Sequence, residues 1–138
     1  MIKRIAVVAA AAFLLWAGVE PARAYFSDSW TEGYGLLLRR YVSPGSRNGV
    51  TCNLVDYKGL REDRRFMKLR RGLARLPSFS TLPERKRLAL WLNIYNFLVL
   101  SLVVDHPGLK NLLEIRKGTT SVWHLAAGEV AGKTHSLH

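Results

Sequence analysis

Asn93 and Asn96 are the side chains in this sequence whose type and spacing best suit chemistry. Both lie in residues 88–104 (LALWLNIYNFLVLSLVV), a run without any charge. Residues three apart on a helix lie on the same side, about 60° from each other. Side-chain amides can orient a substrate or stabilise an oxyanion. A buried amide left unpaired costs about 1–3 kcal/mol, so the pair predicts either a site or a polar network that ties down residues 123–137.

The reaction that this pair would support is hydrolysis of an amide or peptide bond. The base would be one of three histidines near the C-terminus, His124, His135 or His138. A nucleophile is missing, because papain-like and transglutaminase-like hydrolases place a cysteine at the start of their central helix and residues 82–88 contain none. The catalytic residues therefore stay unassigned. The predicted site or buried polar network consists of Asn93, Tyr95, Asn96, Trp123 and His135.

Cys52 is the only cysteine, so no intrachain disulfide can form. It lies in a predicted strand, residues 50–57, and is expected to be a small buried hydrophobe. A catalytic thiol is the alternative, but no nucleophile signature surrounds it. His124, His135 and His138 cluster near the C-terminus, and the spacing from His135 to His138 suits two metal ligands, but a third ligand such as Glu129 would be needed. We therefore predict neither a metal site nor a cofactor.

A cationic amphipathic helix is predicted over residues 59–76. Four apolar residues gather on one side of it: Phe66, Leu69, Leu73 and Leu76. Five cations gather on the other side and form the predicted anion-binding stripe: Arg61, Arg64, Lys68, Arg71 and Arg75. Each would contribute about 1 kcal/mol at an anionic membrane, and the alternative is a solvated helix face. No aromatic residue lies between these cations, so the stripe lacks the stacking platform of a nucleic-acid site.

The elements that would position these side chains centre on one helix, predicted at about 82–106 and ended by Pro107-Gly108. Because residues 88–104 are apolar around the whole circumference, we expect this helix to be covered on every side. With its 17 residues and two asparagines inside, the run is a poor membrane span, which needs about 20 mostly apolar residues. Residues 29–41 predict another helix, 43–49 a turn and 130–134 a hairpin. The predicted class is α+β and mainly helical, with a buried central helix packed by amphipathic helices and a small hairpin or sheet.

Residues 1–24 are typical of a secretory signal peptide. Lys3 and Arg4 precede an apolar run, and Ala22-Arg23-Ala24 forms a small-x-small cleavage site. The full chain of 138 residues has a net charge of +11, and residues 25–138 keep +9. We expect an exported, periplasmic or extracellular single domain with no transmembrane helix after signal removal. Its charge suits anionic partners, such as phosphate-rich or membrane surfaces.

Three segments of the chain resemble domain-of-unknown-function family 547, which occurs in many exported bacterial proteins and some plant proteins. WLNIYNFLVL at 91–100 is similar to the family's Trp-x-Asn-x-Tyr-Asn hallmark. YV at 41–42 with VDYKGL at 55–60, and Trp123 with VAGKTHSL at 130–137, are similar to its flanking segments. The family continues into an Ile-Glu-His segment and a further helical region that have no counterpart here. The resemblance therefore implies a domain matching the N-terminal part of the family, without a transferable activity.

Two function classes follow from these observations, with a structural or assembly role as a third. The first is a non-catalytic exported basic domain that binds an anionic partner through the cationic helix. The alternative is the hydrolase with its site near Asn93 and Asn96. If the family's later segment normally covers the central helix, this chain would expose an apolar patch, and self-association is then expected.

Overall fold

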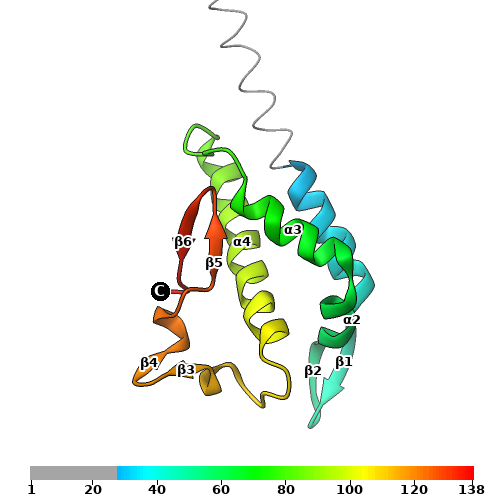
Figure 1. Ribbon diagram of the computed structural model, residues 1–138. Coiled ribbons are helices and arrows are strands. Elements are labelled where there is room, and N and C mark those ends of the chain that lie inside the picture. The colour runs from blue at the N-terminus through cyan, green and yellow to red at the C-terminus, as the bar shows by residue number, and fades with distance from the viewer. Residues whose placement is uncertain (1–27) are drawn as a thin grey trace, which may run out of the picture.

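The computed structural model describes residues 28–138 (Figure 1). The predicted signal peptide lies outside these residues. The described part starts with a helix, residues 28–41, followed by β1 (Val42–Arg47), β2 (Val50–Val55), α2 (Tyr57–Glu62), α3 (Arg64–Ala74) and α4 (Glu84–Asp105). The C-terminal third holds the short elements η1 (Leu112–Glu114), β3 (Arg116–Lys117), β4 (Thr120–Ser121), η2 (Val122–His124), β5 (Gly128–Val130) and β6 (Lys133–His135). Three antiparallel strand pairs, β1–β2, β3–β4 and β5–β6, complete the predicted α+β, mainly helical class, which is confirmed.

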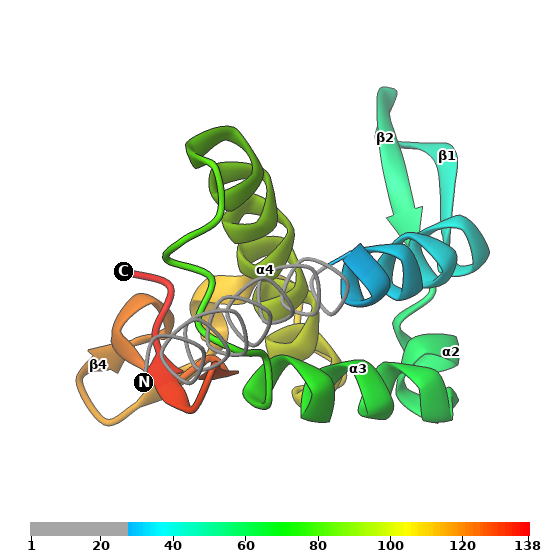
Figure 2. The same ribbon diagram turned by 90° about the horizontal axis from the view of Figure 1, so that it is seen from above.

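Helix α4 is the central element, as predicted. In Figure 1 it runs between the β5–β6 hairpin on one side and α3 and the first helix on the other, and Figure 2 shows the same order from above. Its buried side chains all lie on one side of the helix: Leu90, Ile94, Phe97, Leu98, Ser101, Leu102 and Val104. The helix ends at Asp105, next to the Pro107-Gly108 step that predicted its end, and Gly108 has a positive φ of 87°.

The other flank of α4 is not covered, so the expectation of burial on every side is wrong there. Leu88 is 60% exposed, Leu92 58% and Tyr95 42%. The packed elements all lie against the opposite side, and none of the described elements reaches this flank. By length and composition α4 could also cross a bilayer, with 39% of its most apolar window buried inside the molecule. A helix that is apolar all round is equally typical of a core.

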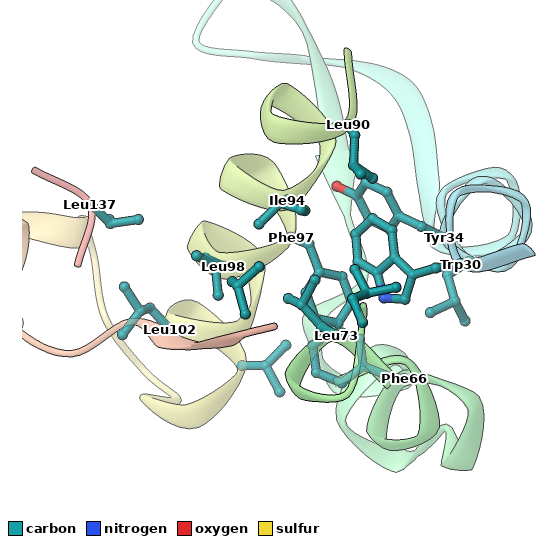
Figure 3. Close-up of a cluster of buried hydrophobic side chains, with 14 of the residues drawn as sticks. Trp30, Tyr34, Phe66, Leu73, Leu90, Ile94, Phe97, Leu98, Leu102 and Leu137 are labelled. Carbon is teal, nitrogen blue, oxygen red and sulfur yellow. The ribbon is translucent and has the colours of Figure 1, made fainter. Parts of the chain in front are cut away.

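An aromatic cluster joins the first helix, α3 and α4 (Figure 3). The Phe97 ring on α4 lies 5.3 Å from Trp30, 5.5 Å from Tyr34 and 5.1 Å from Phe66, measured between centroids. The two contacts with Trp30 and Tyr34 are edge-to-face, the geometry that aromatic quadrupoles favour. The Trp30 indole N–H also donates to the Leu69 carbonyl at 3.0 Å. This cluster fixes α3 against the two helices beside it.

The segment predicted as a turn, residues 43–49, is mostly strand. Residues 42–47 form β1 and pair with β2 from Val42–Val55 to Arg47–Val50, so the turn is only Asn48-Gly49. Both turn residues have positive φ, 53° and 77°, which is the backbone of a tight two-residue hairpin. The broad turn prediction was wrong because Pro44 and Gly45 are tolerated in a two-stranded ribbon, where every strand is an edge.

The predicted helix over residues 59–76 is two helices with a break at Asp63. Asp63 has extended backbone angles (φ −80°, ψ 116°), ends α2 and caps α3. Its carboxylate accepts from the Arg65 backbone N–H at 2.8 Å and from the Tyr41 hydroxyl at 2.8 Å. An aspartate that caps the following helix competes with continuation of the preceding one. The break turns α2 toward α4, where Arg61 Nε donates to the Val104 carbonyl at 2.9 Å.

The predicted C-terminal hairpin is present as β5–β6, and its tip is tied to the end of α3. The tip residues Ala131 and Gly132 have φ of 49° and 76°. Their backbone N–H groups donate to the carbonyls of Leu73 and Ala74 at 3.0 and 2.8 Å. The carbonyls at a helix C-terminus lack partners inside the helix, so the hairpin both caps α3 and is held by it.

Candidate functional site

The cations of α3 fall into two groups that differ in their partners. Arg65 and Arg70 form ion pairs, with Asp63 at 2.6 Å and with Asp105 at 3.1 Å. The others, Arg64, Lys68, Arg71 and the C-cap residue Arg75, are exposed, and within residues 28–138 none of them forms an ion pair. We call these four residues the cationic face. Spaced at four, three and four residues, they lie on one side of the helix, opposite the buried Phe66 and Leu73.

Arg61, the fifth member of the predicted stripe, lies on α2 instead. Its side chain is exposed, and its Nε donates to the last turn of α4. A cation suits that position because carbonyl dipoles give a helix C-terminus negative charge. Arg61 therefore has a structural role that the cationic face lacks. Within the face, Arg71 makes one long contact, from its Nε to the Met67 carbonyl at 3.4 Å.

The paired arginines hold α3 in place. The Arg70 guanidinium lies 5.3 Å from the Phe66 ring and also donates to the Ser101 carbonyl at 3.2 Å. Arg65 forms a fork on Asp63, whose side chain is only 9% exposed. Hydrogen bonds from the Arg65 side chain are the largest cause of an Asp63 pKa held well below its usual range. The two arginines thus join α3 to α4 and to its own cap.

Apolar side chains lie on both sides of the cationic face. Met67 is 41% exposed on one side. On the other side a groove of about 560 Å³ separates α3 from the first helix, with Lys68 and Arg65 among the residues that line it. Leu36, which is 50% exposed, and Leu69 line the same groove. A charged strip flanked by accessible apolar side chains is typical of an element that lies at a lipid–water boundary.

The asparagine pair does not form the predicted buried network. Asn96 is exposed and Asn93 half-buried, and no described hydrogen bond involves either amide. Tyr95 lies on the uncovered flank of α4, and Trp123 lies in η2 with 37% of its surface exposed. The amides need no protein partner because water reaches them. The prediction that they tie down the returning segment is wrong.

Trp91 is one of the residues of the apolar run that meet the returning segment, and Leu98, which lies against Gly128, is another. The Trp91 ring lies 5.3 Å from His135 on β6 and 5.1 Å from Phe79 in the loop after α3. Asn93, Tyr95 and Asn96 belong to α4 itself. Of the other two predicted site residues, His135 packs on α4, and its partner there is Trp91, which was not among the predicted site residues. The sequence contains a pattern that predicts this side of α4: Trp91, Leu98 and Leu102 recur at i, i+7 and i+11, which places them on one side of a helix.

Of the remaining candidates for catalysis or metal binding, His124 and His138 lie side by side, and Cys52 lies apart from them in the β1–β2 hairpin. Ser121 Oγ and His124 Nδ1 are 3.3 Å apart, and His124 stacks on His138 at 4.7 Å. Within the described residues no carboxylate hydrogen-bonds to His124, so the orienting group of a nucleophile–base pair is missing. No cluster of three potential metal ligands occurs among residues 28–138. Cys52 is half-buried opposite Gly45 in the β1–β2 hairpin.

Comparison with known proteins adds no relative to this description. No family model matches the chain, and no curated protein or solved structure matches it either. Membership of family 547 therefore stays a prediction from the three sequence segments. The functional argument depends on the geometry of the chain alone.

Proposed function

We propose that this chain is an exported, non-catalytic module that binds an anionic phospholipid surface through the cationic face of α3. The observation that carries the proposal is the division of the α3 cations. Two are neutralised by carboxylates, while Arg64, Lys68, Arg71 and Arg75 point outward without such a partner among residues 28–138.

An anionic surface fits this arrangement better than a single small anion. The four side chains follow one side of a helix, which is about 1.5 Å long per residue and therefore about 16 Å from Arg64 to Arg75. That length spans several lipid headgroups. Each cation near an anionic leaflet contributes about 1 kcal/mol, so the face supplies about 4 kcal/mol of attraction.

The apolar flanks favour a lipid surface over a nucleic acid. Met67 and Leu36 are exposed beside the cations and could enter the boundary between headgroups and acyl chains. Aromatic side chains, on which bases would stack, are absent from the exposed side of α3. An RNA or DNA strand would find phosphate contacts there but no platform for its bases.

Sedimentation with vesicles tests the proposal. The purified protein is mixed with vesicles of phosphatidylcholine alone or with added phosphatidylglycerol. We expect binding only to the anionic vesicles, and loss of binding as salt shortens the screening length below about 8 Å. The variant R64Q/K68Q/R71Q/R75Q should bind about two to three orders of magnitude more weakly, because it loses most of the electrostatic attraction.

A charge-matched control separates the face from the net charge. The variant R47Q/K58Q/K110Q/K117Q removes the same four charges from exposed positions elsewhere in the described part. It should keep most of the vesicle binding. Equal loss in both variants would show that only net charge matters, and equal binding to neutral vesicles would reject the cationic face as the site.

A further inference from the structure

A second pocket, separate from the cationic face, lies where residues 91–100 and 130–137 meet the loop after α3. It has a volume of about 340 Å³. The loop after α3 contributes Ser78 and Ser80, α4 contributes Arg87 and Trp91, and β6 contributes Lys133 and His135. No residue of the cationic face lines it. The volume lies within the range of small-molecule sites, which start at about 300 Å³.

The walls of this pocket are held by contacts that do not depend on a ligand. Arg87 Nη1 donates to the Ser80 carbonyl at 2.9 Å, which fixes the guanidinium beside the loop. The hydroxyls of Ser78 and Ser80 are 3.2 Å apart and hydrogen-bonded. The tip of the β5–β6 hairpin is tied to the end of α3 through Ala131 and Gly132. A pocket built in this way loses little entropy when it binds.

The lining residues select the chemistry of the ligand. Arg87 and Lys133 bring two positive charges, and no carboxylate lines the pocket. Guanidinium, ammonium and hydroxyl groups together suit the several acceptor oxygens of a phosphate group. Trp91 adds a broad apolar wall, itself supported edge-on by Phe79 and His135. A flat apolar group attached to the phosphate would pack against this wall.

We infer that this pocket binds a small phosphate monoester, with its phosphate between Arg87 and Lys133 and its apolar group on Trp91. This inference does not depend on the membrane-binding proposal, because the two sites share no residue. A ligand that used only the charges would bind as inorganic phosphate does. A ligand that used only the apolar wall would bind as a neutral aromatic alcohol does.

Phenyl phosphate, inorganic phosphate and phenol are the three probes that test these contributions. The readout is the indole N–H signal of Trp91 in proton–nitrogen spectra of the purified protein, assigned by its absence in W91F. We expect phenyl phosphate to shift this signal saturably, and to bind about tenfold more tightly than inorganic phosphate because its ring contacts the indole. Phenol should shift it weakly or not at all. Equal affinity for phosphate and phenyl phosphate would overturn the role of the apolar wall.

Two charge-removing variants complete the test. R87Q/K133Q should weaken phenyl phosphate binding by about tenfold or more, because charge-assisted hydrogen bonds are lost. R116Q/K117Q is the matched control, since Arg116 also donates from its side chain to a backbone carbonyl, that of Leu113 in η1, and Lys117 is exposed. It should keep its affinity. Because Lys133 is exposed on a hairpin edge, K133Q alone should fold normally, and unchanged affinity in K133Q would overturn the inference.

Discussion

The inward side of α3 buries the apolar side chains of Phe66 and Leu73, whereas the outward side carries exposed cations. The inward side packs Phe66 into the aromatic cluster, and its neighbours Arg65 and Arg70 are paired with carboxylates. The outward side carries Arg64, Lys68, Arg71 and Arg75, which have no carboxylate partner among the described residues. One short helix thus contains both the arginines that hold the fold and the cations available to a partner.

The difference shows why a net charge is a poor guide to a binding site. A paired arginine is already neutralised, so a distant anion gains little from it, whereas an unpaired cation keeps its field. The two sides should therefore respond differently to substitution. Changes on the inward side should lower the free energy of unfolding, and changes on the outward side should alter binding while shifting the free energy of unfolding only slightly.

The largest effect is expected for Phe66→Ala. Phe66 is 1% exposed and contacts Phe97 and the Arg70 guanidinium. Truncating a buried phenylalanine costs about 3–5 kcal/mol, because the lost contacts leave a cavity. Its control is Met67→Ala at the neighbouring, 41% exposed position, which should change stability by about 0.5 kcal/mol or less. Urea unfolding followed by circular dichroism measures both, and similar losses would contradict the assignment of the two sides.

The next effect is expected at Asp63, where two substitutions separate the cap from the charge. Asp63→Ala removes the acceptor for the Arg65 N–H and should cost about 1–2 kcal/mol. Asp63→Asn keeps a capping oxygen and removes only the negative charge, so it should cost less. If both variants lost the same stability in urea unfolding, the cap would contribute nothing and the ion pair would explain the whole effect.

The same carboxylate predicts a dependence of stability on pH. The Asp63 pKa is lowered in the folded state, chiefly by hydrogen bonds from the Arg65 side chain. A lowered pKa stabilises the folded state above the unfolded value of about 3.9, and this contribution is lost as pH falls below it. The stability difference between the wild type and Asp63→Asn should therefore shrink between about pH 5 and pH 3. A difference that stays constant over this range would contradict the role of the charge.

The sequence predicted the parts of the fold that depend on local periodicity. Trp30, Tyr34 and Leu37 of the first helix, and Phe66 and Leu73 of α3, are buried as their spacing indicates. The break at Asp63 and the strand β1 were missed, although Asp63 is a strong capping residue and Asn48-Gly49 is a strong hairpin signal. In both places a short local signal lies inside a longer pattern that indicates a different element.

The candidate sites were harder to predict, because they depend on which side of α4 the other helices and the C-terminal hairpin pack against. A helix apolar all round gives no preference for one side, so nothing local shows that Leu92 is left uncovered or that Asn93 reaches water. The contact of Trp91 with His135 joins residues 44 apart in the chain. The four residues of the cationic face were predicted together with Arg61, which contacts α4 instead. Asp63 lies only two residues from Arg65, but Asp105, the partner of Arg70, is 35 residues away and is brought there by the fold.

A smaller effect is expected for the ion pair between Arg70 and Asp105. The Asp105 side chain is 49% exposed and that of Arg70 30%, so solvent screens much of their attraction. Exposed pairs contribute about 0.2–1 kcal/mol, and Arg70→Gln should lose about that much. A double-mutant cycle with Asp105→Asn isolates the pair. A coupling free energy of zero would mean that Asp105 does not neutralise Arg70. The distinction between paired cations on the inward side of α3 and unpaired cations on its outward side would then be weaker.

The smallest effect should have the opposite sign. Lys68 lies four residues after Arg64 and three before Arg71, so like charges face each other along the cationic face. Such spacings destabilise a helix by about 0.2–0.5 kcal/mol per pair. Glutamine and lysine have similar helix propensities, so Lys68→Gln should raise the free energy of unfolding by a few tenths of a kcal/mol. High salt should remove this gain, because it screens the same repulsion. A loss of stability in Lys68→Gln would mean that the ammonium has a partner inside the fold, and the cationic face would then no longer be free for an anionic surface.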